Sequence, residues 1–350
     1  MLCRPRRYVR LLMLVGLALL LGGCLQKTPA TPNAVAVPGP TTQPTQPPIS
    51  PEIYLEPVQL PKGYVAGGAI GDTLILRNTG QTDADSLVLF ANGQLGHEIA
   101  RQPWNTMADF ASDERWFAWC EAKGEMEKKL TDLWKIWVWD SVSGEVRQIA
   151  QEAPKAEGSL GEIGPRLRLS NGRLIWPSVN PAPTSKVQLN LFDLRTGEHR
   201  VLATFEPTAP LRGYDIHGDT IAYGVGKQVV IVSGTKTETI TSEEEVGEVL
   251  VTADGVAWQG RRLIFWRDAR GTKELPCGAV NRWWYTSTDH YITWWEAPGD
   301  QLWLLHTPSG TAQTVIESGV NNGGFVFGKY VAWTQRGEGR GVVGMVAKLP

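Results

Sequence analysis

The chain is poor in the residues that most often build metal centres and disulfide frameworks. Its 350 residues include four cysteines and five histidines. Cys3 and Cys24 fall in the N-terminal segment, which leaves Cys120 and Cys277, and these two lie in different copies of the repeat described below. We therefore expect two buried or idle thiols, with no disulfide and no cysteine-based metal site. No two histidines have metal-ligand spacing on one element, so the sequence predicts no metal and no cofactor.

An excess of basic charge is also missing. The chain has 34 basic and 36 acidic side chains, for a formal net charge of −2. Proteins that bind nucleic acid do so largely through basic surface, so we expect no nucleic-acid partner. The sequence contains no nucleophile elbow, phosphate-binding loop or zinc-peptidase motif. We therefore predict no catalytic residue from local motifs.

The N-terminus has the anatomy of a secretion signal. An apolar run from residue 11 to residue 21, too short to span a bilayer as a mature helix, follows a basic stretch with arginines at positions 4, 6, 7 and 10. The run ends in Leu21-Gly22-Gly23-Cys24, which resembles the bacterial lipobox. That resemblance implies cleavage before Cys24 and a diacylglycerol on its thiol. Removing residues 1–23 deletes four arginines and no acid, so the net charge becomes −6.

The next segment has the composition of a tether. Residues 25–51 contain Lys27 as the only charged side chain, no aromatic residue and eight prolines. Such a stretch cannot bury a core, so we expect an extended linker. The predicted organisation is a signal peptide over 1–23, a lipidated cysteine with a Pro/Thr-rich disordered tether over 24–51, and a folded domain over 52–350. The membrane is thus the expected partner of Cys24, on the extracytoplasmic face, and Leu25 favours the outer membrane in a cell that has two.

A hexapeptide that ends in a large aromatic or aliphatic residue recurs along the folded region. Gly71-Asp-Thr-Leu-Ile-Leu76 and Ala253-Asp-Gly-Val-Ala-Trp258 are two of its copies. The copies end at Leu76, Trp119, Trp176, Tyr223, Trp258, Trp294 and Trp333. Their intervals of 35 to 57 residues approximate the ~40–50 residues of one four-stranded propeller blade.

The segments between copies complete the blade. After each copy come a second β-rich stretch, a hairpin with glycine at a left-handed position, and a further strand, as in 188–203. The sequence therefore predicts an all-β fold, a single β-propeller with seven four-stranded blades, although six blades remain an alternative. The seventh repeat lacks its last strand, and 52–60 alternates like one. We predict that this N-terminal strand closes the ring, with Pro57 suited to an outermost strand.

The pattern over residues 52–350 resembles the propeller repeats of TolB-like and WD40-like proteins. The motifs that carry the resemblance are Ala253-Asp-Gly-Val-Ala-Trp258 and the hairpin Phe192-Asp-Leu-Arg-Thr-Gly197. The Ser-Pro-Asp-Gly run of that group is missing, and Thr252-Ala-Asp-Gly255 is its nearest approach. The resemblance implies a rigid binding platform in the bacterial envelope.

In a propeller the first strand of each blade lines the central channel. Aligning these strands on the hexapeptides gathers charged, amide and aromatic residues near one end of the channel, with Asp109 among them. Arginines, asparagines and a tryptophan pair could hold an acidic or sugar-like ligand. The interpretation that we favour is that Trp283 and Trp284 pack between blades and that the charges are solvated. The candidate ligand-binding residues are Arg166, Arg212, Glu248, Asn281, Trp283, Trp284 and Asn322. Two long connections, 121–133 and 177–186, are expected on the same face and could also be solvated loops.

These observations favour a membrane-anchored lipoprotein whose propeller binds a protein or cell-envelope polymer without catalysis. One alternative is a propeller enzyme, a lyase or lactonase-like hydrolase, with a site in the channel assembled from separate blades. A second alternative is a surface protein that binds carbohydrate through Trp283 and Trp284. Two or more inward acids around a divalent ion would favour the enzyme, whereas a mixed-charge or apolar mouth would favour binding.

Overall fold

We describe the protein from a computed structural model. It describes residues 53–79, 84–103, 106–122, 134–152, 165–179, 186–260, 264–275, 281–297, 300–337 and 342–350. Side chains are described at most of these positions. Residues 50–350 form one compact unit.

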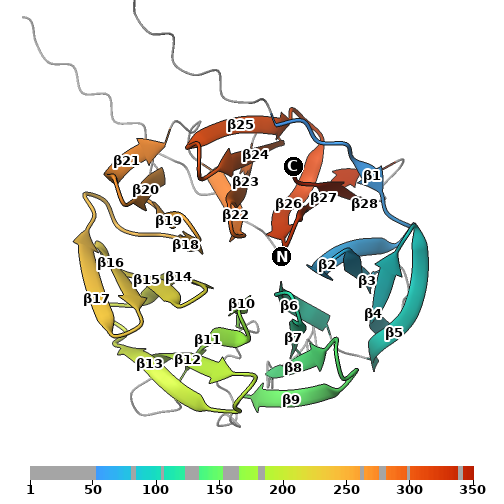
Figure 1. Cartoon of the computed structure of the whole chain (residues 1–350), viewed down its shortest axis with the longest axis horizontal. Helices are drawn as coiled ribbons and strands as arrows, with labels where there is room; N and C mark the ends of the chain where they lie inside the picture. The colour runs from blue at the N-terminus through green and yellow to red at the C-terminus, as the bar shows by residue number, and fades with distance from the viewer. Residues whose placement is uncertain are drawn as a thin grey trace, which may run out of the picture. The chain divides into compact units, whose positions relative to one another are not determined.

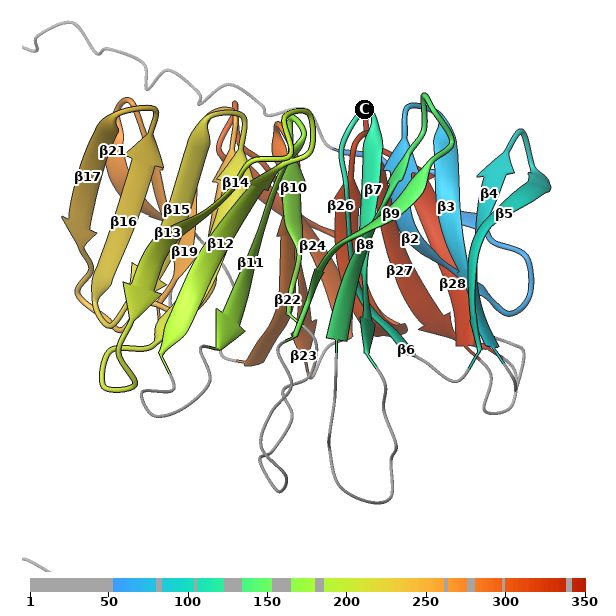
Figure 2. The same ribbon diagram turned by 90° about the horizontal axis from the view of Figure 1, so that it is seen from below.

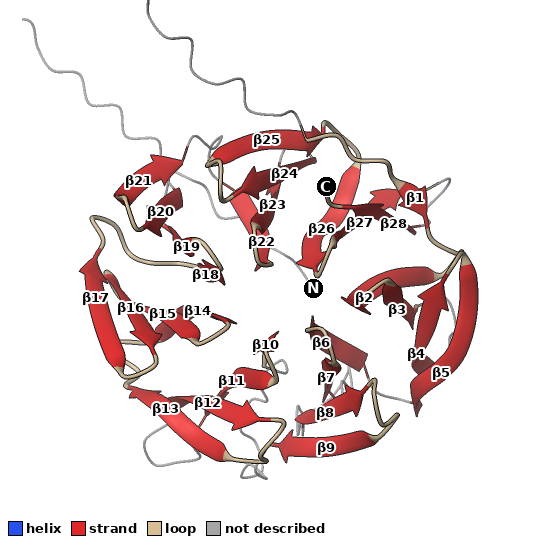
Figure 3. Cartoon of the chain, viewed as in Figure 1, coloured by secondary structure: helices blue, strands red, loops and turns tan. Residues whose placement is uncertain are grey.

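The described part of this unit is built only from β-strands, which form seven four-stranded antiparallel sheets. The sheets stand side by side around a central axis as a seven-bladed propeller (Figure 1, Figure 3). The predicted fold class and the count of seven blades are confirmed. The described residues include no helix that could cross a membrane.

We number the blades 1 to 7 along the chain. Blade 1 contains β2 (Tyr64–Ile70), β3 (Thr73–Asn78), β4 (Ala84–Ala91) and β5 (Gln94–Pro103). Blade 2 contains β6 (Thr106–Ser112), β7 (Trp116–Ala122), β8 (Trp134–Asp140) and β9 (Val146–Gln151). Blade 3 contains β10 (Arg168–Ser170), β11 (Arg173–Val179), β12 (Val187–Asp193) and β13 (His199–Phe205). Blade 4 contains β14 (Leu211–His217), β15 (Thr220–Val225), β16 (Gln228–Ser233) and β17 (Lys236–Thr241). Blade 5 contains β18 (Val249–Thr252), β19 (Gly255–Gln259), β20 (Ile264–Asp268) and β21 (Gly271–Leu275). Blade 6 contains β22 (Asn281–Ser287), β23 (Tyr291–Ala297), β24 (Gln301–His306) and β25 (Thr311–Ile316). Blade 7 contains β26 (Val320–Phe327), β27 (Tyr330–Arg336), β28 (Val342–Lys348) and β1 (Val58–Gln59).

The first and last strands of the propeller, β1 and β28, share blade 7, as the sequence predicted. Its strand order is β1-β28-β27-β26, with Val58 opposite Val346 and Gln59 opposite Met345. The strand is shorter than the predicted 52–60, because Pro57 has no N–H to add to the ladder. Leu60 N donates to Gly344 O at 2.9 Å, and Gln313 Nε2 donates to Ile53 O at 2.7 Å. The ring is therefore closed by chain from both ends.

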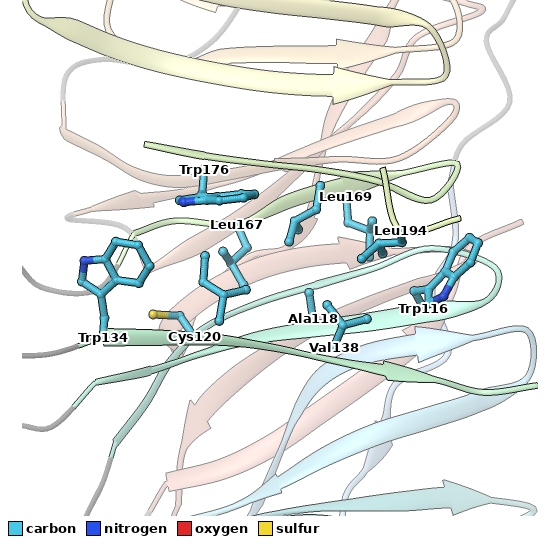
Figure 4. Packing of buried hydrophobic residues seen from close by; sticks show 11 residues of the cluster. Trp116, Ala118, Cys120, Trp134, Val138, Leu167, Leu169, Trp176 and Leu194 are labelled. Carbon is cyan, nitrogen blue, oxygen red and sulfur yellow. The ribbon is translucent and has the colours of Figure 1, made fainter. Parts of the chain in front are cut away.

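The core lies between the blades. Seven clusters of buried hydrophobic residues occur, one at each junction of neighbouring blades. Figure 4 shows the cluster between blades 2 and 3, where Trp116 and Leu194 lie at one end and Trp134 and Trp176 at the other. Each sheet is thus buried on both faces, which explains why its middle strands read as nearly continuous apolar runs.

The hexapeptide tryptophans belong to these clusters. Trp119, Trp258, Trp294 and Trp333 are at most 2% exposed, and Trp176 is 3% exposed. These tryptophans therefore belong to the core of the blades. Cys120 is a free, buried thiol whose pKa is raised by burial, whereas Cys277 lies outside the described residues.

A β-bulge recurs near the start of the innermost strands. The register shifts between Ala66 and Gly68, between Met107 and Asp109, and between Leu211 and Tyr214. Shifts at the corresponding place interrupt β22 and β26. A bulge adds one residue to one strand, so the side chains before and after it point differently from a simple alternation.

The two faces of the ring differ in their connections. Within each of blades 1 to 6, the turn between the first two strands and the hairpin between the last two lie on one face, seen at the top of Figure 2. The innermost strands begin at the other face, which we call the mouth face. Residues 123–133 and 180–185, which make up most of the two long connections, lie outside the described residues.

Candidate functional site

The structure brings together two of the seven predicted ligand-binding side chains. Arg166 Nη1 donates to Glu248 Oε2 at 2.8 Å. Arg166 lies just before β10 in blade 3, and Glu248 lies just before β18 in blade 5. This ion pair therefore links blade 3 directly to blade 5, past the start of blade 4, although blades 3 and 5 are not neighbours.

Gly213 makes this pairing possible. It lies in β14 of blade 4, and a Cβ placed on it would stand 2.3 Å from Val249 N and 2.6 Å from Glu248 C. Only a residue without a side chain allows the start of β18 to approach β14 so closely. Tyr214, the next residue, donates its hydroxyl to Arg166 O at 2.7 Å and holds the backbone of blade 3 from the other side.

Arg168 extends the pair into a network. Its side chain is 15% exposed, with Nε 3.5 Å from Asp215 Oδ1 and Nη2 3.6 Å from Glu248 Oε1. Glu248 thus lies between two arginines. Burial acts to lower the pKa of Arg168, but the nearby carboxylates of Asp215, Glu248 and Asp109 outweigh burial and raise it.

Asp215 ties three blades together. It is 3% exposed and belongs to β14, and its Oδ2 accepts hydrogen bonds from Val251 N of blade 5 at 2.8 Å and from Ser287 Oγ of blade 6 at 2.5 Å. Burial raises the pKa of Asp215, and Arg168 opposes that rise. A buried carboxylate with an arginine and two hydrogen-bond donors is satisfied on both oxygens.

Asp109 repeats this arrangement two junctions earlier, between blades 2 and 3. Its Oδ2 accepts a hydrogen bond from Leu167 N, which joins blade 2 to blade 3. Burial raises the pKa of Asp109 as well, again opposed by Arg168. We call Asp109, Arg166, Arg168, Asp215 and Glu248 the axial network.

Arg212 is separate from this network. It lies in β14 and is exposed, and it makes no hydrogen bond or ion pair with another described residue. It therefore offers a free guanidinium at the mouth face. The backbones of Asn281, Trp283, Trp284 and Asn322 lie in β22 and β26, but their side chains lie outside what the structure describes. Their predicted role stays a prediction.

Sequence reasoning missed Arg168, Asp215, Tyr214 and Ser287. Arg168 follows Arg166 by two residues, and period-2 alternation could have placed both on the channel side. Asp215 could not be found in this way, because the bulge between Leu211 and Tyr214 shifts the register of β14. The alignment on hexapeptides assumed no bulge.

The arrangement of charges limits what the axis can do. Its acids are bonded to arginines, to backbone N–H groups or to a serine, so their charges are used within the fold. Among the described residues, no cluster of three or more His, Cys, Asp or Glu side chains has a geometry that could hold a metal ion. The mouth is therefore of mixed charge, with Arg212 exposed to a partner.

Comparison with known proteins identifies the fold of the chain but no family. No family model matches the chain, and no curated protein matches it. Among solved structures it is similar to an oligogalacturonate lyase in complex with manganese, at 12% identity and a TM-score of 0.56, over 85% of this chain and 96% of that chain. Oligogalacturonate lyase from Vibrio parahaemolyticus gives 14% identity and a TM-score of 0.55, over 86% and 92% of the two chains.

A third similar structure is the β-propeller domain of the Trilobed protease from Pyrococcus furiosus. It has 14% identity and a TM-score of 0.55, over 84% of this chain and 93% of that chain. Its ring has an open velcro topology, whereas here β1 completes blade 7. At these identities the likeness shows the propeller fold, and function has to be argued from the site.

Proposed function

We propose that this chain is a lipid-anchored extracytoplasmic lipoprotein whose propeller binds a protein or cell-envelope polymer at its mouth face without catalysis. The observation that carries the proposal is the pairing of Arg166 with Glu248, together with the unpaired, exposed Arg212 beside it. The acids at the axis neutralise arginines, and a cation remains exposed. A rigid rim with an unsatisfied guanidinium suits recognition of an acidic or hydroxyl-rich partner.

The anchor is supported by the sequence of residues 1–24. A lipidated Cys24 would place the mature chain in the membrane fraction and carry radiolabelled palmitate after growth in its presence. Replacing Cys24 by Ala removes the thiol that accepts the lipid. We expect Cys24→Ala to abolish the label and to release the protein from membranes. Label retained on the Cys24→Ala chain would refute the anchor.

The binding role is tested by capturing envelope components on the immobilised mature chain. We expect Arg212→Glu to lose the captured partner, because it reverses an exposed positive charge at the mouth face that is unpaired among the residues described. Arg200→Glu is the matched control, since Arg200 is an exposed arginine on the outermost strand of blade 3. Equal capture by the native chain and the Arg212→Glu variant would reject the mouth as the binding surface.

The enzyme alternative rests on the buried acids at the axis and on the similarity in fold to oligogalacturonate lyase. It is tested by incubating the purified chain with oligogalacturonate and manganese and following formation of unsaturated ends. We expect no product above the rate seen without protein. Product formed by the native chain above that rate would replace the binding proposal by a lyase.

A further inference from the structure

A cavity of about 260 Å³ lies between blades 2 and 3, on the face opposite the mouth. It is lined by three arginines, two acids and one aromatic ring. These are Arg115, Arg147, Arg195, Asp140, Glu145 and Trp116. We call this space the interblade cavity. None of its residues belongs to the axial network.

Bonds between the two blades hold its walls. Asp113 Oδ2 accepts a hydrogen bond from Gly172 N at 2.7 Å, and Arg147 Nη2 donates to Leu194 O at 2.7 Å. The ring of Trp116 packs against Gly172, where an added Cβ would lie 2.6 Å from Cζ3. Gly172 also has a φ of 69°, which favours glycine. The walls are thus fixed before any ligand arrives.

Sequence makes this junction different from the other six. The second residue of the hexapeptide is Arg115 in blade 2. The other copies have Asp72, Gly172, Asp219, Asp254, His290 and Lys329 at that place. Only blade 2 combines an arginine there with a following tryptophan, and the Arg115 guanidinium lies 4.6 Å from the centre of the Trp116 ring.

Arg115 is largely occupied by its own blade. Its Nε donates to Asp140 Oδ1 at 2.9 Å and its Nη2 donates to Asp140 Oδ2 at 2.7 Å. This bidentate pairing lowers the pKa of Asp140, so the carboxylate stays ionised at neutral pH. The Arg115–Asp140 pair therefore forms a fixed part of the cavity wall that presents both hydrogen-bond donors and hydrogen-bond acceptors.

Arg195 is held less tightly than the corresponding arginine of blade 5. The hairpins of blades 3 and 5 share the pattern Asp-X-Arg, in Asp193-Leu-Arg195 and Asp268-Ala-Arg270, with the same backbone bond from the arginine N–H to the aspartate. Arg270 also donates Nε at 3.0 Å and Nη2 at 2.6 Å to Asp268. Arg195 reaches Asp193 only through Nη2 at 3.4 Å.

The exposure of the two arginines agrees with this difference. The Arg195 side chain is 48% exposed, whereas that of Arg270 is 71% exposed. Arg195 lines the interblade cavity, so its side chain is less exposed than that of Arg270. Most of its guanidinium N–H groups make no hydrogen bond with a described residue. Arg147 likewise gives one donor to a carbonyl and keeps the others. Two guanidinium groups consequently face the same space with free N–H groups.

We propose that the interblade cavity binds a monoanionic sugar acid, a single hexuronate unit. Three arginines against Asp140 and Glu145 leave one net positive charge on the lining, which suits one carboxylate. The two acids supply acceptors for hydroxyl groups and would repel a more highly charged phosphate. The volume lies just below the ~300 Å³ at which pockets for larger ligands begin, so it suits one sugar ring. This site is independent of the proposed binding role of the mouth.

Calorimetric titration of the purified mature chain tests the proposal. The probes are glucuronate, galacturonate, glucose and inorganic phosphate. We expect one saturable site for a hexuronate, with glucose at least about tenfold weaker because it lacks the carboxylate. Arg195→Ala is expected to weaken hexuronate binding at least about tenfold as well. The control Arg270→Ala should bind as the native chain does, because its hairpin is the same and lies in blade 5.

A thermal unfolding scan of Arg195→Ala should match that of Arg270→Ala, which shows that any loss of binding is not a loss of fold. Saturable binding of a hexuronate that Arg195→Ala weakens supports the site. The proposal is overturned by no saturable binding of either hexuronate, by binding that Arg195→Ala leaves intact, or by phosphate binding more tightly than the hexuronates.

Discussion

The axial network and the interblade cavity are made from the same residue types, arginines beside carboxylates, yet they differ in how completely the charges are paired. At the axis Arg168 is 15% exposed and contacts two carboxylates, and Asp215 is bonded on both oxygens. At the cavity Arg195 has one long contact to Asp193 and Arg147 keeps free donors. Buried charges that satisfy one another hold blades together, whereas half-exposed charges that are incompletely paired can meet a ligand.

The largest expected effect comes from removing one partner at the axis. Asp215→Asn leaves Arg168 buried with one carboxylate fewer and places an amide against Val251 N–H. We expect a loss of about 3–5 kcal/mol in the free energy of unfolding, measured by urea denaturation. The exposed pair between Glu238 and Arg267 is the control, where Glu238→Gln should cost less than about 1 kcal/mol. Equal costs at the two sites would remove the distinction between the axis and the exposed charges.

The next effect concerns the close approach that the network requires. Gly213→Ala would drive a Cβ against the backbone of residues 248 and 249, which cannot move as a flexible side chain could. We expect a loss of about 1–3 kcal/mol, seen as a lower midpoint of thermal unfolding. Gly96→Ala is the control, because its Cβ would meet its nearest atom at 3.5 Å. A Gly213→Ala chain as stable as the control would mean that β14 and β18 are not locked together.

The two regions should respond to pH with opposite sign. Burial raises the pKa of Asp109 above its ordinary value of 3.8, so its contribution to stability is present at low pH and is lost as pH rises through the folded pKa. The hydrogen bond from Arg115 lowers the pKa of Asp140, so its contribution is present above 3.8 and is lost as pH falls below that value. The stability difference between native chain and variant should therefore shrink from about pH 3 to about pH 7 for Asp109→Asn and grow for Asp140→Asn.

Urea unfolding of both variants and the native chain at several pH values checks this prediction. The unfolded carboxyl groups titrate near their ordinary value in all three chains, so they form a common reference. If both stability differences change in the same direction with pH, the assignment of a raised pKa to Asp109 and a lowered pKa to Asp140 is wrong.

The smallest expected effect is at Arg212. Because this exposed arginine has no described partner, Arg212→Ala should change the free energy of unfolding by less than about 0.5 kcal/mol. Capture of an envelope partner should fall nonetheless, which separates a recognition residue from a structural one. A destabilisation of more than about 1 kcal/mol would place Arg212 with the axial network instead.

The sequence predicts the architecture well because each blade repeats the same burial problem. Seven hexapeptides with a bulky last residue predicted seven blades, and the alternation around Pro57 predicted that the N-terminal segment completes blade 7. The intervals between copies varied without obscuring the pattern, since length differences fall in connections rather than in the buried strands.

The site was less predictable, for two physical reasons. A bulge in β14 moves Asp215 away from the position that a simple alignment gives it. The pairing of Arg166 with Glu248 depends on contacts between blades, and 82 residues of sequence separate the two partners. Neither the axial network nor the interblade cavity follows from one blade considered alone, because each is assembled from side chains of different repeats.

The closure of blade 7 has a mechanical consequence. Tension on the chain before residue 53 would reach β1 first, and β1 has only two residues in its ladder. That short strand is reinforced on both sides, because Leu55 is buried between blades 6 and 7 and Leu60 between blades 7 and 1. Peeling β1 from β28 would therefore uncover two apolar junctions at once, so the segment that joins the propeller to the preceding chain also acts as a clasp against force.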